Sequence, residues 1–491
     1  MLHSKNTNTI STAFEGFSWN VTGNFMRSAA GFAINIILAR VLGPEPFGIV
    51  AVALLIIGIG NLIIESGLGS SIIQKEEITS EDIAFVFTLQ MLFGISLFLI
   101  IIFIAPWLAD QFNSQNAVPV IQVMAFMLIL QAFAQVPSAL LRRNLNFKRL
   151  QIAQISSFFV GYLVFGIPLA LTGFGVWSLV AAQVIQSGLN ATLVYLWSRH
   201  NLSLSLKGSS QITVFGLRIL FANIANWLIQ YIDQAVIGKR FGAQNLGLYS
   251  RAYFLNWTPV GIILSSAQAT MFSAISRIGK SEETSHLFLG VMKVFAIFFF
   301  PVYWLIALEA KNIIYIIYGP EWLPAADVLI PLAVSMPFLA LVGLEGPVLN
   351  GLGKPHYEMW AQWITAIFAV IVLTVSANIS LIFTAWSILS IYLFRLAIMS
   401  IMTIKVTGIS IKQLIYPVFF GLGLGTATVV LWFFAERVIA FNSIPLIELT
   451  ARCLPVVLVL SVFIWIGRNQ FFPEYPQLMK LIQNYKKEKL Q

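Results

Sequence analysis

The sequence predicts an all-α protein that crosses a membrane many times, and three observations carry that prediction. The 491-residue chain is 58% hydrophobic and only 10% charged, with a mean hydropathy of +0.85. A soluble domain carries about 25% charged residues, so this composition is that of an integral membrane protein. Apolar runs of about 20 residues, long enough for a helix to cross a bilayer core, recur along the chain. Alternating stretches of about ten residues, typical of outer-membrane barrels, are absent.

Apolar runs bounded by charged residues, glycine or proline predict about fourteen spans. Those of the first half cover 16–39, 47–70, 83–108, 117–138, 150–171 and 176–198. Those of the second half cover 212–237, 250–275, 287–308, 324–344, 357–377, 381–403, 413–434 and 446–467. No cleavage pattern precedes the first run, so we expect the first span to remain in the protein. Prolines and glycines inside the spans fit kinks and close helix contacts, or hinges for bending.

Basic residues favour an orientation with the N terminus in the cytoplasm. In that orientation roughly 18 of the lysines and arginines fall in cytoplasmic segments and about 6 outside. The clearest clusters are the loop 142–149 and the C-terminal tail. The net charge of +9 is therefore mainly a topology signal, with attraction to anionic lipid heads as a further effect. A nucleic-acid partner is not expected, because the basic residues are scattered over short loops.

Candidate catalytic and metal chemistry is sparse. Cys453 is the single cysteine, and the four histidines form no metal-binding motif, so no metal or other cofactor is expected. No phosphate-binding glycine loop occurs, and the predicted outer loops carry acidic residues only singly. A membrane glycosyltransferase or polymerase would require a catalytic carboxylate in such a loop. The pattern favours a carrier over an enzyme.

A short hydrophilic motif occurs twice, at 39–49 and at 239–249. Each copy, here called a hinge copy, has a basic residue, a glycine, a polar turn and a second glycine between apolar residues. A repeat of this kind indicates two duplicated membrane lobes, an arrangement that many secondary transporters build around a central site.

Polar residues form a stripe on the helix that leads into each hinge copy. At about 100° per residue, each set falls on less than half of the helix circumference. The stripes comprise Asn20, Asn24, Arg27, Ser28, Gly31 and Asn35 on the first span, and Arg218, Asn223, Asn226, Gln230 and Asp233 on the seventh. Ionisable groups inside a membrane cost about 2.5–3.5 kcal/mol each on insertion scales, so they usually face a cavity or a partner. Two matched stripes therefore predict a shared central cavity.

Several of these residues admit a structural interpretation as well. A single asparagine often only bonds a neighbouring helix, whereas Arg27 and Arg218 lie deep in their spans and favour the cavity. Asp233 is near Lys239 and Arg240, so an ion pair or a cap is as good an interpretation as a functional role. The other candidates are Glu65 at the inner end of the second span, Lys293 on the ninth and Arg395 on the twelfth.

The chain resembles the Wzx-like polysaccharide and oligosaccharide flippases of the multidrug/oligosaccharidyl-lipid/polysaccharide exporter superfamily. The matching segments are 38–48, 66–69, 142–149, 173–180, 233–239, 246–249 and 350–355. The pattern is most similar to the branch that serves colanic acid, amylovoran and teichuronic acid. The resemblance implies two six-helix lobes around a central cavity plus two peripheral helices. On this chain the parts would be an N-terminal lobe at 1–205, a C-terminal lobe at 206–408, peripheral helices at 409–470 and a basic cytoplasmic tail at 471–491.

The resemblance also implies a function and roles for the candidate residues. The cargo would be an oligosaccharide repeat unit on undecaprenyl pyrophosphate, moved by alternating access across the bacterial cytoplasmic membrane, with both termini in the cytoplasm. A polysaccharide polymerase and export machinery would be further partners. The candidates for the pyrophosphate are Arg27, Arg218, Arg395 and Lys293, and those for the sugar are Asn20, Asn24, Asn223 and Asn226. Asp233 and Glu65 would serve ion coupling or gating. A peptidoglycan lipid precursor or a drug remains an alternative cargo on the same fold.

Overall fold

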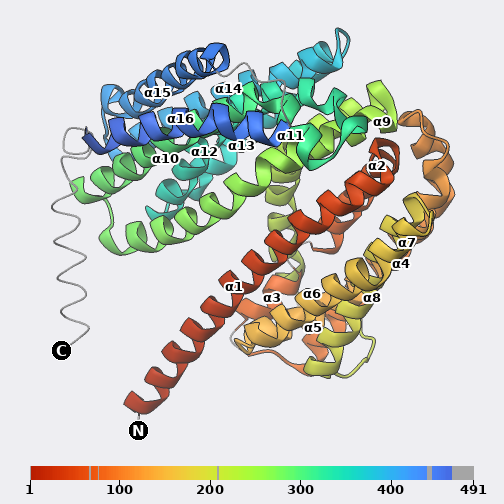
Figure 1. Cartoon of the computed structure of the whole chain (residues 1–491). Coiled ribbons are helices and arrows are strands. Elements are labelled where there is room, and N and C mark those ends of the chain that lie inside the picture. Colours follow the sequence, from red (N-terminus) through yellow and green to blue (C-terminus); the bar gives the residue numbers. More distant parts are fainter. Residues whose placement is uncertain (1, 66–67, 76, 207–209, 439–444, 467–491) are drawn as a thin grey trace. The chain divides into compact units, whose positions relative to one another are not determined.

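The computed structural model describes residues 2–65, 68–75, 77–206, 210–438 and 445–466. Side chains are described within these ranges except at 2–18, 20, 21, 70, 74, 210–219, 221, 222, 463, 464 and 466. Every regular element in the described ranges is helical, and no strand occurs there (Figure 1). The predicted all-α class is confirmed.

The first six predicted spans correspond to long helices joined by short connections. They are α1 (Leu2–Leu42), α2 (Pro44–Ile64), α4 (Ser80–Gln111), α5 (Ala117–Arg143), the composite α6 (Phe147–Phe159), η1 (Val160–Gly166) and α7 (Ile167–Leu171), and α8 (Val176–Ser198). A short helix, α3 (Leu68–Gln74), follows α2. The second predicted span therefore ends earlier than expected, and α3 takes up its last residues.

The second half is built in the same way from long helices. They are α9 (Ser210–Ile278), α10 (Glu282–Leu308), α12 (Pro324–Gly351), α13 (Pro355–Ser376), α14 (Leu381–Thr407), α15 (Ile411–Val438) and α16 (Pro445–Ile466), with the short α11 (Ala310–Ile317) and η2 (Pro320–Trp322) between α10 and α12. Thirteen helices of the described chain are long and apolar enough to cross a membrane. One of them, α9, leaves helical geometry at Gly242 (φ 80°, ψ 177°), so it holds two predicted spans and the fourteen are accounted for.

The fifth span changes helix type part-way. Pro168 has no N–H to donate, and its ring crowds the carbonyl four residues earlier, so the regular α pattern cannot continue through this turn. The chain adopts the wider π-helix η1 just before the proline. Gly161 in η1 lies against α8, where a Cβ would come within 2.5 Å of the Ala182 carbonyl oxygen. Glycine is therefore required for this close contact.

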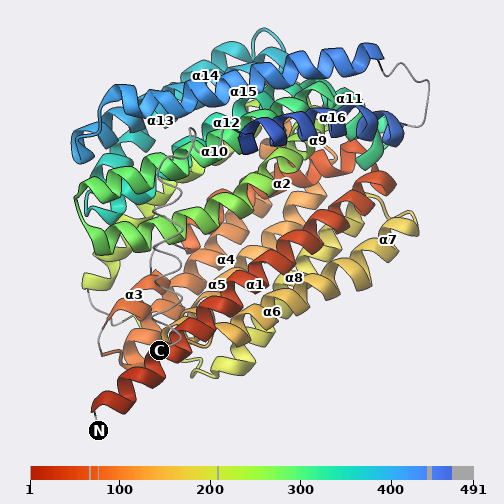
Figure 2. The ribbon, with the colours of Figure 1, turned by 60° about the vertical axis from the view of Figure 1, so that its left-hand side comes forward.

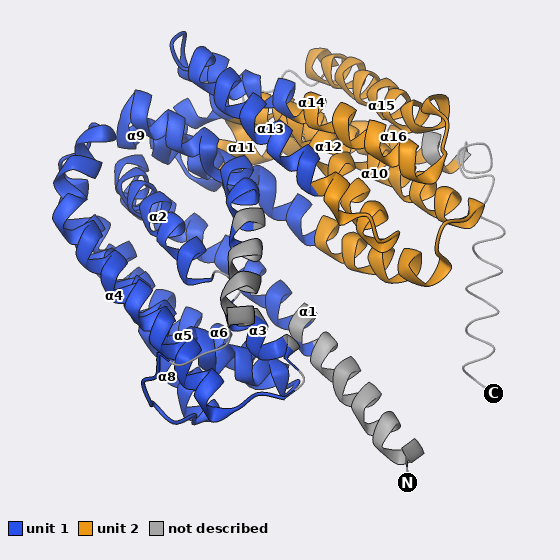
Figure 3. Ribbon diagram, turned by 180° about the vertical axis from the view of Figure 1, so that it is seen from behind, with its two compact units in different colours: residues 1–262, 317–328, 359–391 blue, residues 263–316, 329–358, 392–491 orange. Residues whose placement is uncertain are grey.

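The helices form two compact units, coloured separately in Figure 3. Unit 1 contains residues 1–262, 317–328 and 359–391, and unit 2 contains 263–316, 329–358 and 392–491. Inside unit 1, α5 packs against α2, α4 and α8, and α1 lies along α6 (Figure 2). Inside unit 2, α15 packs against both α10 and α16.

A buried carboxylate fastens the last two helices of unit 2 to the end of α10. Glu309 is 2% exposed and accepts hydrogen bonds from Trp432 Nε1 and Asn312 Nδ2, both at 2.7 Å. Arg452 on α16 approaches the same carboxylate at 3.9 Å and Glu448 at 3.6 Å. The apolar side chains Leu424, Val456 and Leu460 pack beside this group. The polar contacts thus fix α15 and α16 at one point of an otherwise apolar interface.

Candidate functional site

The polar stripe of α1 faces α6 within unit 1. Arg27 is half-buried and donates to Gln154 Oε1 at 3.1 Å and to Asn24 Oδ1 at 3.3 Å. One turn earlier, a Cβ at Gly23 would come within 2.5 Å of Gln151 Oε1, so the two helices are in close contact there. Asn24 is exposed. The stripe is therefore a polar seam in which Arg27 is held by amide oxygens.

The far end of the same stripe meets an arginine that the sequence reasoning missed. Asn35 Oδ1 accepts a 2.7 Å hydrogen bond from Arg251 Nη1, while Asn35 Nδ2 donates to the Gly31 carbonyl at 2.8 Å. Arg251 is the second residue of the predicted eighth span, where it reads as an ordinary interfacial anchor. The break at Gly242, nine residues earlier, comes from backbone torsions that the sequence does not reveal, so no sequence signal marked Arg251.

Aromatic rings surround the Arg251 guanidinium. Its Cζ lies 4.7 Å from the Phe47 ring centroid and 5.1 Å from that of Phe254, within the range of cation–π attraction. Tyr318 and Tyr162 are near enough to interact with it electrostatically. Burial raises the pKa of Tyr318 to about 12, so its hydroxyl remains a hydrogen-bond donor.

Two donors of this cluster are available to a ligand. Arg251 Nε and the Tyr318 hydroxyl are buried and have no hydrogen-bond partner among the residues that the structure describes. A buried donor without an acceptor is costly, about 1–3 kcal/mol, and such groups commonly mark a binding site. We call the group formed by Asn35, Phe47, Tyr318 and Arg251 the Arg251 cluster.

Asp233 bonds to a tyrosine. It is 4% exposed and accepts hydrogen bonds from the Tyr249 hydroxyl at 2.6 Å and from the Gln234 N–H at 2.7 Å. Tyr249 lies beyond Gly242, so this bond joins the two halves of α9 across their break. Asp233 lies inside α9, so these contacts link the two halves of that helix, and a role in gating or coupling stays a prediction.

Two of the predicted cations, Lys293 and Arg395, have protein partners in unit 2. Lys293 on α10 lies 5.2 Å from the ring centroid of Tyr416 on α15. Arg395 on α14 is half-buried and interacts electrostatically with Glu345. Glu345, which sequence reasoning also missed, is fully buried on α12 and accepts from Ser400 at 2.8 Å and Thr403 at 3.4 Å. It sits at the end of a predicted span, where acidic residues are usually assigned to the surface.

The remaining predicted residues fall in less defined surroundings. Asn223 is half-buried, and Asn226 is exposed with Gln230 Nε2 at 3.5 Å from its Oδ1. Glu65, just past the end of α2, accepts from Gln135 at 3.4 Å, and partial desolvation raises its pKa above the usual value. The side chains of Asn20 and Arg218 lie outside the described residues.

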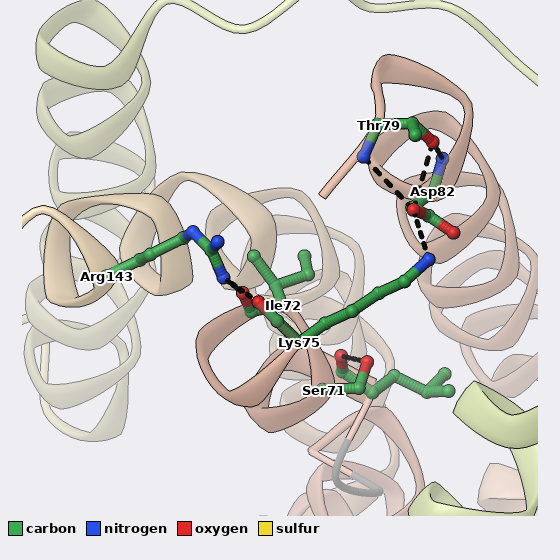
Figure 4. Close-up of polar contacts among 7 residues, drawn as sticks. Ser71, Ile72, Lys75, Thr79, Asp82 and Arg143 are labelled. Atoms are coloured by element: carbon green, nitrogen blue, oxygen red, sulfur yellow. Dashed lines mark hydrogen bonds and ion pairs between the residues drawn. The ribbon is translucent and has the colours of Figure 1, made fainter. Parts of the chain in front are cut away.

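Part of the basic loop 142–149 has a structural task (Figure 4). Arg143 Nη1 donates to the carbonyls of Ile72 and Lys75, both at 2.6 Å, and so caps the C-terminal end of α3. Lys75 pairs with Asp82 at 2.6 Å, and Asp82 forms a capping box with Thr79 at the start of α4. The other cations of the loop, Arg142, Lys148 and Arg149, are exposed.

The two hinge copies share an unusual backbone conformation. Gly43, which precedes α2, has φ 70° and ψ −177°, and Gly242 has φ 80° and ψ 177°. Residues other than glycine rarely adopt this conformation. The repeat found in the sequence is therefore also a repeat of local structure.

Comparison with known proteins agrees with these features. A family model described as "Polysaccharide biosynthesis protein" matches residues 37–327. The succinoglycan biosynthesis transport protein ExoT of Rhizobium meliloti (strain 1021) is 26% identical over 359 residues, which cover 72% of each chain. The lipopolysaccharide biosynthesis protein WzxC of Escherichia coli (strain K12) is 22% identical, covering 69% of this chain and 68% of its own.

Solved structures support the same fold. The lipid II flippase MurJ in an inward closed conformation superposes with a TM-score of 0.76 at 14% identity, covering 92% of this chain and 98% of its own. An inward-facing MATE family multidrug transporter of the MOP superfamily gives a TM-score of 0.58 at 15% identity, covering 82% of this chain and 96% of its own. The fold of helices described above is thus one used by membrane exporters. With more than half of its length matched by the family model, the chain belongs to the polysaccharide biosynthesis protein family and has the fold of the MOP exporter superfamily.

Proposed function

We propose that this protein flips an oligosaccharide repeat unit, linked to undecaprenyl pyrophosphate, from the inner to the outer face of a bacterial cytoplasmic membrane. The observation that carries the proposal is the Arg251 cluster, a half-buried cation with buried, unpartnered donors inside a protein of the polysaccharide biosynthesis family. The transport protein ExoT, for succinoglycan biosynthesis, is among its relatives. Alternating access is the mechanism that this fold and its internal repeat favour.

The chemistry of such a cargo matches the residue types available. A pyrophosphate brought into a low-dielectric site needs cations with directed donors, and arginine binds phosphate in a bidentate way that lysine does not. Arg251 Nε and the Tyr318 hydroxyl offer two such donors. Arg27, in the middle of the α1 stripe, would follow as a second phosphate contact. Arg218 belongs to the same proposal on sequence grounds.

The sugar part of the cargo needs a polar path. A hydroxyl moved into hydrocarbon without a partner costs several kcal/mol, roughly 4–8 on the strictest scale. Asn20, Asn24, Asn223 and Asn226 would supply exchangeable donors and acceptors. Arg395 and Lys293 are weaker phosphate candidates because each already has a protein partner in unit 2.

Three sources of free energy could drive the outward movement of the cargo. Outward movement of each negative charge in an inside-negative cell gains about 2.3 kcal/mol per 100 mV. Removal of product outside by a polymerase and export machinery would add to this. An ion could be exchanged at an acid, for which Glu345 is a further candidate beside Asp233 and Glu65, because it is fully buried near a cation.

The lobe boundaries predicted from sequence belong to the same proposal. They place 1–205 and 206–408 around a central cavity, with 409–470 as peripheral helices and 471–491 as a tail. Both termini would lie in the cytoplasm, where the basic loop 142–149 would contact anionic lipid heads.

A reconstitution experiment tests the cargo. Liposomes holding the purified protein would receive a fluorescent undecaprenyl-pyrophosphate oligosaccharide in the inner leaflet, and its exposure to an outside quencher would be followed. We expect exposure above that of empty liposomes, and a rate reduced at least tenfold in Arg251→Gln but unchanged in the exposed control Arg277→Gln. Flipping of a lipid-linked glycopeptide in place of the oligosaccharide would favour the alternative cargo suggested by the MurJ fold. No flipping of any polyprenyl glycan would exclude the proposal.

A further inference from the structure

The two hinge copies align residue by residue at a constant offset of 199 positions. Gly43 corresponds to Gly242, and Gly48 corresponds to Gly247. In both copies a glycine with positive φ precedes a helix, α2 in the first case and the second half of α9 in the other. The question that this raises is how the two copies lie with respect to each other inside unit 1.

The two copies touch each other reciprocally. A Cβ at Gly48 would overlap the carbonyl oxygen of Ala243 and lie 3.1 Å from the N atom of Gly247. A Cβ at Gly247 would overlap the carbonyl oxygen of Pro44 and lie 3.0 Å from the N atom of Gly48. Pro44 and Ala243 are themselves equivalent positions, so exchanging the copies exchanges the two contacts. This is the pattern of a two-fold interface, here between segments of one chain.

The contact between the copies leaves no space for any side chain at the two glycines. Real Cβ atoms essentially never approach another heavy atom closer than 3.0 Å, and both overlaps involve main-chain oxygen, which cannot turn aside as a side chain can. The helices meet through bare backbone, where each atom pair contributes only about 0.1–0.2 kcal/mol. Surfaces of this kind can part without any side chain changing its rotamer.

A loop from later in the chain covers the first copy. Trp322 is 1% exposed, donates through Nε1 to the Ala39 carbonyl at 2.9 Å and meets the Phe47 ring edge-on at 5.8 Å. Arg40 Nε donates to the Ile317 carbonyl at 2.8 Å. Residues 317–328 belong to unit 1. The first hinge copy is thus covered by this later segment.

The glycine contact lies beside the Arg251 cluster. Arg251 follows Gly247 by four residues, so it projects from the same helix face one turn further along. Phe47, the residue before Gly48, supplies the ring 4.7 Å from the guanidinium. Any separation of α2 from α9 at the glycines would also separate Phe47 from Arg251.

We infer that the reciprocal Gly48–Gly247 contact is a closed gate at the hinge end of the transport pathway. The gate opens when α2 and the second half of α9 separate, and Trp322 leaves the first hinge copy in the same movement. The inference rests on the proposed transport function. The competing interpretation is a permanent small-residue seam, of the kind that holds many membrane helices together.

Distances between spin labels test the gate without any transport assay. Replacing Cys453 with serine removes the single native cysteine, and labels are then placed at Glu45→Cys and Gln244→Cys, exposed and equivalent positions on the two helices. In lipid nanodiscs we expect a dominant short distance and a second, longer one that grows when undecaprenyl pyrophosphate is added. Gly48→Ala should populate the longer distance without any addition. Gly423→Ala is the matched control, since nothing lies within 4 Å of its Cβ position.

The outcomes separate the inference from the proposed function. A single short distance under all conditions, with Gly48→Ala changing only the melting temperature, would mean a permanent seam and overturn the gate. If Gly48→Ala does not fold, a bismaleimide crosslink between the two cysteines decides: arrest of flipping supports the gate, and unchanged flipping refutes it. A protein that shows both distances but flips no glycan keeps the gate and rejects the cargo.

Discussion

The Arg251 guanidinium donates a 2.7 Å hydrogen bond to Asn35 Oδ1, which joins the second half of α9 to the polar stripe of α1. The partner explains why the stripe extends as far as Asn35. It also places this half-buried arginine where the helix that leads into the first hinge copy meets the helix that follows the second. The bond is therefore the first target for mutation.

Arg251→Lys should impair transport almost as much as Arg251→Gln. Lysine keeps the charge but loses the planar fork that reaches Asn35 and a phosphate together, so we expect a rate at least tenfold lower, which corresponds to about 1.4 kcal/mol. The measurement is the initial flipping rate in liposomes at matched protein content. A lysine variant with the wild-type rate would show that charge alone is needed.

The Asp233–Tyr249 bond should contribute to stability. Tyr249→Phe leaves a buried carboxylate with one donor fewer, for which we expect a loss of about 1–3 kcal/mol in the free energy of unfolding. Asp233→Asn should cost a similar amount, and the double variant less than the sum, because both remove one interaction. Thermal unfolding in detergent measures this, with the exposed Tyr231→Phe as control. If the losses of the two single variants added up to that of the double variant, the result would contradict an interaction between Asp233 and Tyr249.

The Glu309 group should hold the last two helices in place. Trp432→Phe keeps the aromatic ring but removes the N–H that donates at 2.7 Å, so we expect a loss of about 1–3 kcal/mol in unit 2. Trp386→Phe, on an exposed face of α14, is the control and should change little. Limited proteolysis after α15 should become faster in the first variant only. Equal cleavage in both would refute the role of Glu309.

Stability should fall in mild acid because of His200. This side chain lies outside the predicted spans between the rings of Phe87 and Tyr195, at 5.3 and 5.6 Å, and burial lowers its pKa below the usual 6.5. Below pH 6.5 the imidazole therefore binds a proton more readily in the unfolded chain than in the folded chain. The free energy of unfolding is highest above that pH and decreases below it. Melting temperatures of wild type and His200→Phe across pH 5–8 test this. In His200→Phe the melting temperature should decrease less in mild acid than in the wild type. In His356→Phe, changed at an exposed position, it should decrease as in the wild type.

The fold was largely predictable because hydrophobic length is a strong signal. Thirteen described helices contain the predicted spans, and the fourteenth is separated only by the backbone of Gly242. The composite fifth span was not foreseen, since the consequence of Pro168 depends on how the chain relieves the missing hydrogen bond. The second span was predicted to end too late because Leu68, an apolar residue soon after the end of α2, belongs to the separate helix α3.

The candidate site was predictable only in part. The stripe on α1 is visible from helical spacing, yet spacing does not reveal that Gln154 is the partner of Arg27. Arg251 and Glu345 were missed because each lies near the end of a predicted span, where a charged residue ordinarily reaches water. Their burial is a tertiary property, because it depends on residues distant in the sequence, such as Tyr318 for Arg251 and Ser400 for Glu345.

Gly242 connects two spans through a single non-helical residue, with no loop between them. The direction of the second helix is therefore set by one pair of backbone torsions. The 243–262 segment is about 30 Å long at 1.5 Å per residue. A turn of about 10° at that residue would displace the far end by roughly 5 Å. A small change in the torsions of one glycine would therefore produce a large movement at the other end of the helix.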